Sequence, residues 1–233
     1  MRVAIMQPTY LPWMGYFNLI KSSDVFVFLD DVQFAKRSWQ QRNKILLHGK
    51  EKYLTVPVKT KNAKSLQLSE VMVDDQQEWR KDHKNTLFHA YYNHPFGKEV
   101  WQEISEVLDG ESDLLCEINI SIINKICHKL NMNKKILRSN EIPVTGKKSE
   151  YLLKICQNLE AEKYLSAMGS KEYIEKESLF RNSKIQVVYQ NYSPKTYHQF
   201  GCSGFTPYLS IIDLIANIGW EKVLDHFDEN CFD

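Results

Sequence analysis

The sequence predicts an α/β fold with a mostly parallel, Rossmann-like sheet and a helical insertion or subdomain. Two short apolar runs without polar alternation, residues 3–6 and 25–29, are typical of strands that are covered on both faces. Residues 12–23 lie between them and have the length of a short crossover helix, which completes a β-α-β unit. Further short strands, alternating with helical segments, are expected at residues 135–138, 163–165 and 185–189.

The composition indicates one globular domain. The chain has 233 residues, of which 43% are hydrophobic and 25% charged, so we expect a single α/β domain over residues 1–233. The aromatic share of 12% slightly favours a ligand cleft lined by rings. A net charge of +1 gives no sign of a nucleic-acid partner, and the sequence does not predict an oligomeric state.

The cysteines and the apolar segments indicate a cytoplasmic protein. The five cysteines are odd in number and form no CxxC pair, which suits reduced thiols better than a disulfide framework. The residues before Gln7 and Pro8 are too few for the apolar region of a signal peptide. No apolar run reaches the roughly 18 residues that a membrane span needs. We therefore expect a cytoplasmic location and no membrane span.

Polar side chains follow the first two predicted strands at the point where each strand ends. Gln7 comes directly after the first strand, and Asp30, Asp31 and Gln33 follow the second. Ligands of open parallel sheets bind beyond the carboxyl ends of the strands, so these side chains are expected to line a ligand site. Adjacent residues of a strand point to opposite faces, so we expect the two carboxylates to reach one ligand only if the chain turns there. One of them is a candidate for acid–base chemistry or for capping and ion pairing.

The next segment is basic. Residues 35–52 contain Lys36, Arg37, Arg42 and Lys44 with one acidic residue, and Lys61 and Lys64 extend the basic stretch. A β-hairpin is expected between residues 44–47 and 53–58, with its turn at residues 48–50. Such a charge run is usually a solvated surface. The alternative is an electropositive rim for a ligand that carries phosphate.

Three consecutive helices interrupt the alternation of strands and helices. They are expected at residues 74–92, 97–109 and 112–130. Because no strand separates them, we interpret residues 74–131 as a helical insertion packed beside the sheet. Trp79, His83 and Tyr91 share the apolar face of the first helix. His83 is therefore either a hydrogen-bonded core residue or a residue for proton transfer that faces a cleft.

A short turn joins a later strand to a helix. It comprises residues 166–170, and the helix that follows contains Tyr173. Because the N–H groups at a helix start attract anions, Ser166, Gly169 and Ser170 are either a plain tight turn or a cradle for a phosphate or carboxylate. They are not part of a P-loop or a dinucleotide fingerprint.

The last helix is expected at about residues 207–217, with Gly219 as its stop. Ser210, Asp213 and Asn217 form a polar stripe along it, which either faces solvent or closes the cleft from behind.

Several of these segments together resemble the WbqC-like family. The resemblance rests on Gln7-Pro8-x-Tyr10-x-Pro12-Trp13-x-Gly15-Tyr16-Phe17, on the block from Phe26 through Asp30-Asp31-Val32-Gln33 and Ser38-Trp39 to Arg42-Asn43-Lys44-Ile45, on Thr55-Val56-Pro57-Val58, and on Leu209-Ser210 with Asp213, Asn217 and Gly219. Members of that family tend to be linked with bacterial O-antigen and other surface-polysaccharide biosynthesis. The resemblance therefore implies a cytoplasmic protein that handles an activated sugar or a group destined for one.

The leading hypothesis is an enzyme that modifies a nucleotide-linked sugar by acyl or aminoacyl transfer to a sugar amine. The acyl donor would be a coenzyme A thioester or a carrier protein. The sequence does not identify a cofactor, and no metal-ligand set is predicted. The candidate catalytic residues are Asp31, His83 and Lys36. The candidate substrate-binding residues are Gln7, Tyr10, Gly15, Asp30, Gln33, Arg37, Trp39, Arg42, Asn43, Ser166, Gly169, Ser170, Tyr173, Ser210 and Asp213.

Two alternatives remain open from the sequence. One is a nucleotidyl or other phosphate-centred transferase in which Asp30 and Asp31 hold Mg²⁺. The opening is similar to that of nucleotidyltransferase-like folds, although residues 12–17 contain no His pair to grip phosphate. The other is a non-catalytic binding protein of a polysaccharide assembly complex.

Overall fold

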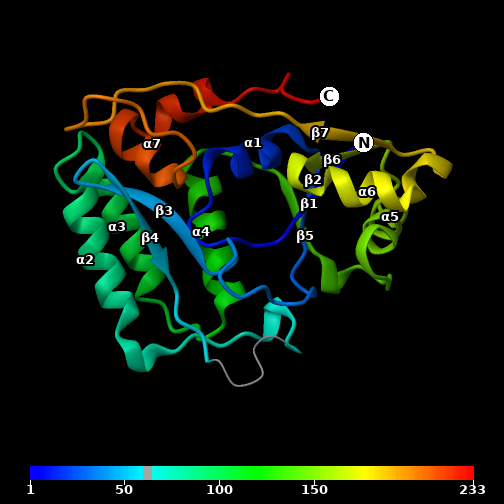
Figure 1. Cartoon of the computed structure of the whole chain (residues 1–233), viewed down its shortest axis with the longest axis horizontal. Helices are drawn as coiled ribbons and strands as arrows, with labels where there is room; N and C mark the ends of the chain where they lie inside the picture. Colours follow the sequence, from blue (N-terminus) through cyan, green and yellow to red (C-terminus); the bar gives the residue numbers. More distant parts are fainter. Residues whose placement is uncertain (60–64) are drawn as a thin grey trace.

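A computed structural model describes residues 1–59 and 65–233 and shows a five-stranded parallel sheet (Figure 1). Its strands are β1 (Arg2–Met6), β2 (Val25–Phe28), β5 (Lys135–Arg138), β6 (Lys163–Ala167) and β7 (Gln186–Gln190), in the spatial order β5-β2-β1-β6-β7. The first strand is central, and the chain moves outward from it first in one direction and then in the other. The strand order therefore reverses between β1 and β6, which is the topological switch point of a Rossmann-like sheet. The predicted α/β fold is confirmed.

The apolar residues of the central strands alternate between two cores. Val3 and Ile5 of β1 pack on one face with α5 (Lys148–Asn158) and α6 (Lys171–Glu177). Ala4 lies on the other face, which is covered by α1 (Met14–Ser22), α4 (Leu115–Lys129) and α7 (Ile211–Ile218). Figure 1 shows the two groups of helices on opposite sides of the sheet. Both faces are thus buried, which explains why the strands lack polar alternation in the sequence.

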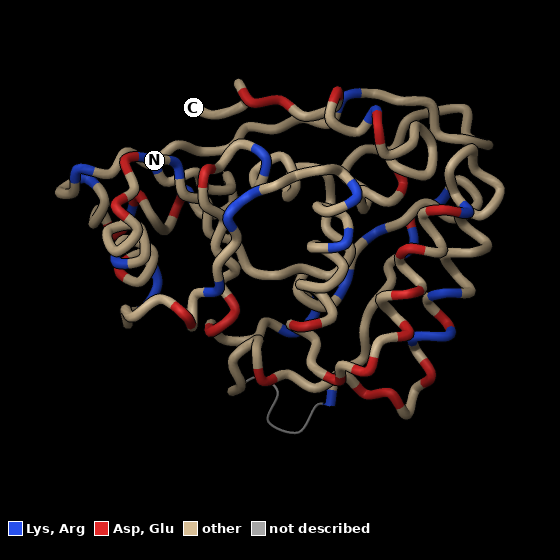
Figure 2. Tube along the Cα trace, turned by 180° about the vertical axis from the view of Figure 1, so that it is seen from behind, with Lys and Arg blue, Asp and Glu red and all other residues tan. Residues whose placement is uncertain are grey.

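Two further helices and a hairpin extend the structure at one end. The helices are α2 (Trp79–Tyr91) and α3 (Gly97–Leu108), and the hairpin consists of β3 (Arg42–Leu47) and β4 (Lys50–Thr55). In Figure 2, acidic and basic residues recur together along α2 and α3. Lys129 of α4, for example, lies 2.8 Å from Glu99 and 3.0 Å from Glu103 of α3. The three expected helices between residues 74 and 131 exist, while their status as an insertion within a single domain stays a prediction.

Some boundaries differ from the expected ones. The last helix begins at Ile211 and not near Pro207, because Tyr208 has a φ of 60° that a helix cannot continue. The hairpin turn has positive φ at His48 (50°) and Gly49 (73°), which matches the primed turns that join paired strands. Lys61 and Lys64 of the expected basic stretch lie outside the described residues.

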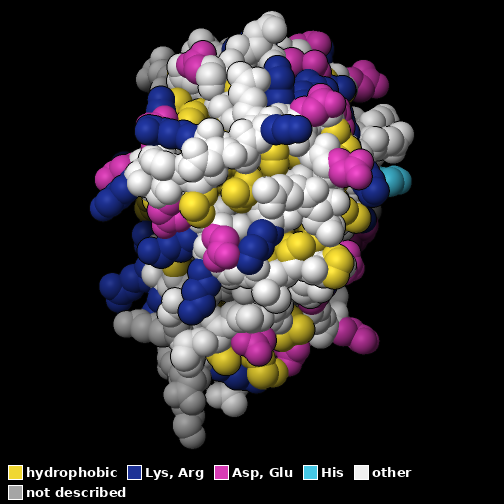
Figure 3. Space-filling view, turned by 90° about the vertical axis from the view of Figure 1, so that its right-hand side faces the viewer, with side chains coloured by type: hydrophobic (Ala, Val, Ile, Leu, Met, Phe, Trp, Pro, Cys, Tyr) yellow, Lys and Arg dark blue, Asp and Glu magenta, His cyan; other side chains and the backbone are white. Residues whose placement is uncertain are grey.

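None of the described helices has the length and apolar character needed to cross a membrane. On the side of the molecule that carries α5 and α6, Figure 3 shows basic, acidic and hydrophobic side chains interspersed. No single sign of charge dominates that face, in line with the net charge of +1.

Candidate functional site

A cleft opens at the carboxyl edge of the sheet, beside the switch point. Its larger part, here called the charged chamber, has a volume of about 890 Å³, which is within the range of ligand pockets. Strand ends and the start of α5 supply its walls. The lining residues are Gln7, Leu29, Asp31, Val32, Gln33, Gln67, Val144, Thr145, Gly146, Lys147, Lys148, Tyr151, Leu152, Tyr173 and Glu177.

A smaller cavity of about 210 Å³, here called the aromatic pocket, adjoins the charged chamber. Gln7, Leu29, Leu152 and Tyr173 line both, so the two form one continuous cleft. The other residues of the aromatic pocket are Ile5, Met6, Thr9, Ser38, Trp39, Gln40, Tyr164, Ser166, Ala167 and Ser170. The cleft brings together seven of the predicted site residues, which are Gln7, Asp31, Gln33, Trp39, Ser166, Ser170 and Tyr173. Gln7, Asp31 and Gln33 among them follow the strand-end argument, whereas Asp30 does not line the cleft.

Asp31 presents a carboxylate to the charged chamber. Its Oδ2 accepts a hydrogen bond from the Tyr151 hydroxyl at 2.5 Å, and its Oδ1 accepts one from Ser139 Oγ at 2.6 Å. Burial and the charge of Asp31 raise the pKa of Tyr151, so this phenol stays protonated and remains a donor. Within residues 1–59 and 65–233, Asp31 forms no ion pair with a Lys, Arg or His side chain. The carboxylate is held in place by two hydroxyl groups and lines the chamber.

Asp30 does not line the chamber, although it neighbours Asp31; both follow the end of β2, and the chain bends at Asp31. Its carboxylate is 0% exposed, and its Oδ2 lies 2.6 Å from Nε of Arg138. Arg138 also pairs with Glu117 of α4 at 2.7 Å. Ser139 Oγ lies 3.0 Å from Asp30 Oδ1, so one hydroxyl touches both aspartates. Asp30 is therefore the buried end of an ion-pair network behind the cleft, in which the side chains of Arg138 and Glu117 are 26% and 35% exposed.

The basic residues of the cleft differ from those that the sequence suggested. Lys147 and Lys148, at the start of α5, line the charged chamber, and Glu177 stands opposite Lys148 at 3.9 Å. The Glu177 carboxylate also accepts the Ser149 N–H at 3.2 Å. This corner of the chamber thus holds two cationic side chains and one anionic side chain.

The predicted basic rim is not assembled along the cleft. Lys36 and Arg37 are exposed and belong to neither wall. Lys44 pairs with Glu51 across the hairpin at 2.9 Å, and Arg42 lies 4.7 Å from the ring centroid of Tyr53. Within the hairpin, Lys44 thus faces Glu51 and Arg42 faces Tyr53. A role of Lys36, Arg37, Arg42 and Lys44 in ligand binding stays a prediction.

The remaining predicted residues lie outside the cleft. His83 is buried on α2, 2.8 Å from the Tyr10 hydroxyl, and burial lowers its pKa to about 4. The buried Asn43 amide donates to the carbonyl oxygens of Tyr10 and Leu11 and shapes the loop after β1. Gly169 is exposed and lines neither wall of the cleft.

Gly15, Ser210 and Asp213 are buried and contribute to the packing around α1 and α7. A Cβ at Gly15 would lie 2.2 Å from the Trp13 ring. Asp213 accepts hydrogen bonds from the Tyr197 hydroxyl at 2.6 Å and from Gln199 at 2.9 Å, and burial raises its pKa. Ser210 precedes α7 and is 1% exposed. A functional role for these three residues stays a prediction.

The structure also adds residues that the sequence did not single out. Lys147 and Tyr151 line the chamber at the start of α5, and the buried Ser139, just after β5, holds Asp31 from behind. The signal that could have found them is the one that found Gln7 and Asp31, because this segment also follows the carboxyl end of a parallel strand.

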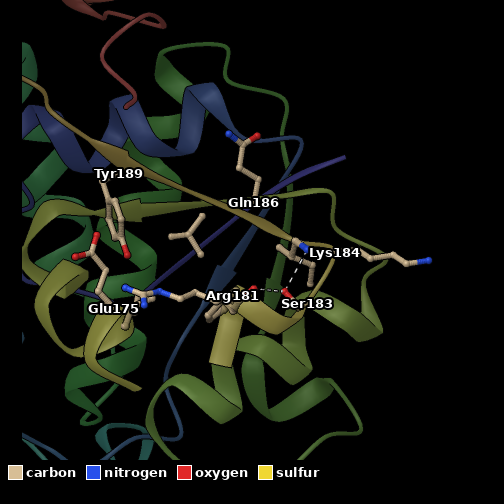
Figure 4. A pocket seen from close by; sticks show the side chains of 10 residues that line it. Glu175, Arg181, Ser183, Lys184, Gln186 and Tyr189 are labelled. Atoms are coloured by element: carbon tan, nitrogen blue, oxygen red, sulfur yellow. Dashed lines mark hydrogen bonds between the residues drawn. The ribbon is translucent and has the colours of Figure 1, made fainter. Parts of the chain in front are cut away.

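A separate cavity of about 570 Å³ lies beside the edge strand β7, and no predicted site residue lines it. In Figure 4 the side chains of Glu175, Arg181 and Tyr189 point toward one another there, whereas Lys184 points away. Ser183 Oγ donates to the Phe180 carbonyl at 2.8 Å and closes the local turn. This cavity is open and unconnected to the polar strand ends, so it is a weaker candidate than the cleft.

Two comparisons with known proteins match almost the whole length of the chain. An uncharacterized protein of Mycobacterium tuberculosis is 31% identical over 221 residues, which cover 94% of this chain and 95% of that protein. No solved structure matches the chain. The model of the WbqC-like protein family matches residues 7–225, a range that contains every residue lining the charged chamber. On this evidence the chain belongs to the WbqC-like protein family.

Proposed function

We propose that the chain is a cytoplasmic enzyme of bacterial surface-polysaccharide biosynthesis that transfers an acyl or aminoacyl group to the amine of a nucleotide-linked sugar. The observation that carries this proposal is the charge pattern of the chamber. Asp31 offers a carboxylate without an ion-pair partner among the described residues, and Lys147 and Lys148 line the same space. A ligand with an amine at one point and a diphosphate at another matches both signs of charge.

The proposed roles follow from the contacts. Asp31 binds the sugar ammonium, while Tyr151 and Ser139 fix the carboxylate by hydrogen bonds. Lys147 and Lys148 bind the diphosphate oxygens. Gln7 and Gln33, which line the chamber, offer amide groups to sugar hydroxyls.

The transfer step needs a base beside the amine. The ammonium gives one proton to Asp31, and the free amine attacks the carbonyl carbon of a thioester donor, a coenzyme A derivative or a carrier-protein conjugate. The C–N bond forms as the C–S bond breaks, and the departing thiolate takes the second amine proton. His83, the other candidate base, is buried against Tyr10 and does not line the chamber. Geometry therefore favours Asp31 as the base.

The same geometry disfavours the alternative of a phosphate-centred transferase in which Asp30 and Asp31 together hold Mg²⁺. Asp30 is tied to Arg138 behind the cleft, so the two carboxylates do not face one ligand. Asp31 alone is left to meet a cation in the chamber, and an ammonium group needs only one carboxylate.

A product assay tests the proposal. The protein is incubated with UDP-glucosamine and acetyl coenzyme A, and mass spectrometry follows the N-acylated sugar while a thiol reagent follows released coenzyme A. Both products are expected for the wild-type chain and for the control Asp225→Asn, an exposed carboxylate outside the cleft. Asp31→Asn is expected to lose at least tenfold in rate. Binding of UDP-glucosamine without product from any thioester donor would instead support the non-catalytic alternative.

A further inference from the structure

We propose that Trp39 and Tyr173 form an aromatic clamp that stacks the base of a nucleoside diphosphate, while the diphosphate extends into the charged chamber. The inference rests on the proposed function and deepens it, because it names how the nucleotide part of the substrate is recognised. It also divides the cleft into two parts with separate tasks, and each part can be tested alone.

The two rings belong to different elements and line the same small space. Trp39 lies in the loop between β2 and β3, and Tyr173 lies on α6. They are 50% and 38% exposed, so both rings are accessible to a ligand in the pocket. The aromatic pocket that both rings line has a volume of about 210 Å³, equal to that of about seven liquid waters at about 30 Å³ each. That space suits one heteroaromatic ring system and is too small for a whole nucleotide.

Trp39 is held in a fixed orientation. Its carbonyl oxygen accepts the Tyr10 N–H at 3.0 Å, which ties the loop to the segment after β1. Its ring stacks on Tyr53 of β4 with centroids 6.3 Å apart and an angle of 29° between the planes. Arg42 lies over the Tyr53 ring at 4.7 Å. The stack supports the indole in place before a ligand arrives, which lowers the entropic cost of binding.

The polar groups of the aromatic pocket are neutral. None of its lining residues, all of them in the described part of the chain, carries a formal charge. Ser166 Oγ and Ser170 Oγ lie 2.5 Å apart, and Gln40 donates to Gln7 Oε1 at 2.8 Å. Hydroxyl and amide groups are the partners that the polar edge of a neutral base requires, whereas the charged groups of the cleft lie in the chamber next door.

The shared residues give the order of the ligand along the cleft. Gln7 and Tyr173 line both the aromatic pocket and the charged chamber. A nucleoside diphosphate with its base between the rings therefore directs its phosphates toward Lys147 and Lys148. The attached sugar then enters the part of the chamber that contains Asp31.

Isothermal titration with UDP, CDP, GDP, ADP and inorganic pyrophosphate tests the clamp. The nucleoside diphosphates are expected to bind more tightly than pyrophosphate. Base stacking on one aromatic ring corresponds to about a 5- to 150-fold change in affinity, so Trp39→Ala and Tyr173→Ala are each expected to weaken nucleoside diphosphate binding within that range. Pyrophosphate binding should not change in either variant.

Three further variants control for folding and for indirect effects. Trp39→Phe and Tyr173→Phe keep a ring and should retain most of the affinity, and Tyr208→Ala removes a ring of equal exposure (50%) that does not line the aromatic pocket. If the alanine variants of Trp39 and Tyr173 bind UDP as well as the wild-type chain does, the clamp is refuted while the amine-transfer proposal stands. If no nucleotide and no nucleotide-linked sugar binds to the wild-type chain, both proposals fail.

Discussion

The buried pair of Asp30 and Arg138 gives a quantitative test of how the carboxyl edge of the sheet is held together. Substituting Arg138→Met removes the cation that faces the Asp30 carboxylate, which is 0% exposed and also contacts the Ser139 hydroxyl. Removing one member of a buried ion pair costs about 3–5 kcal/mol, because an uncompensated charge stays behind. Domains of this kind have a free energy of unfolding of about 5–15 kcal/mol, so the loss should be a large fraction of the total.

Urea unfolding followed by circular dichroism measures this change in the free energy of unfolding. The matched control is Arg2→Met, because Arg2 and Asp24 pair at 3.1 Å on the surface with side-chain exposures of 43% and 44%. An exposed pair contributes at most about 1 kcal/mol. The double variant Asp30→Asn with Arg138→Met should recover much of the loss, because no buried charge is left unpaired. A loss for Arg138→Met no larger than that for Arg2→Met would refute the reasoning.

Three other results are expected. His83 has a folded-state pKa of about 4, below its unfolded value of 6.5. The free energy of unfolding should therefore be unaffected by His83 above pH 6.5 and should decline as the pH falls toward 4, because the unfolded chain binds the proton more readily. A His83→Gln variant should lack this part of the pH dependence in urea unfolding between about pH 4 and 7. Gly15→Ala should destabilise the chain by about 1–3 kcal/mol, because the new Cβ would lie 2.2 Å from the Trp13 ring, whereas Gly169→Ala meets no atom within 4 Å and should leave the thermal midpoint unchanged. Glu177→Gln should bind inorganic pyrophosphate several-fold more tightly, since it removes the negative charge of the chamber corner, and unchanged or weaker binding in titration calorimetry would show that the phosphates lie elsewhere.

The opening of the chain was predictable because local pattern and topology agree there. The apolar runs that became β1 and β2 are buried on both faces, and a parallel pair places their ends at one edge. This rule located Gln7 and Asp31 without any knowledge of the rest of the sheet. Strand alternation does not decide the directions of Asp30 and Asp31, because both follow the end of β2 and the chain bends at Asp31. Asp31 lines the chamber and Asp30 does not, yet both carboxylates contact the Ser139 hydroxyl.

The basic side of the cleft could not be found from charge density alone. The sequence run around Lys36 and Lys44 is richer in cations than the segment around Lys147, yet the cleft is lined by the latter. The reason is tertiary: the hairpin pairs Lys44 with Glu51 and turns Arg42 toward Tyr53. A run of charges carries no information about which elements will stand opposite it.

Tyr151 illustrates a second limit of prediction from the sequence. It is a core residue by its helical spacing, and its ring is 6% exposed, but its hydroxyl reaches Asp31 from 120 residues away in the chain. Sequence periodicity assigns a face to a side chain and not a partner to its polar atom. Contacts of this kind between a helix start and a distant strand end become visible only when the sheet order is known.

The most direct test of the central claim compares the affinities of UDP-glucosamine and UDP-N-acetylglucosamine, which differ in the charge of one amine. A hydrogen bond to a charged group contributes about 1.5–3 kcal/mol, so the wild-type chain should prefer the free amine by about 10- to 150-fold. The Asp31→Asn variant should bind both ligands with similar affinity, because the group that distinguishes them is gone. Equal affinities in the wild-type chain, or a preference that survives in Asp31→Asn, would contradict the assignment of Asp31 as the site of the sugar amine.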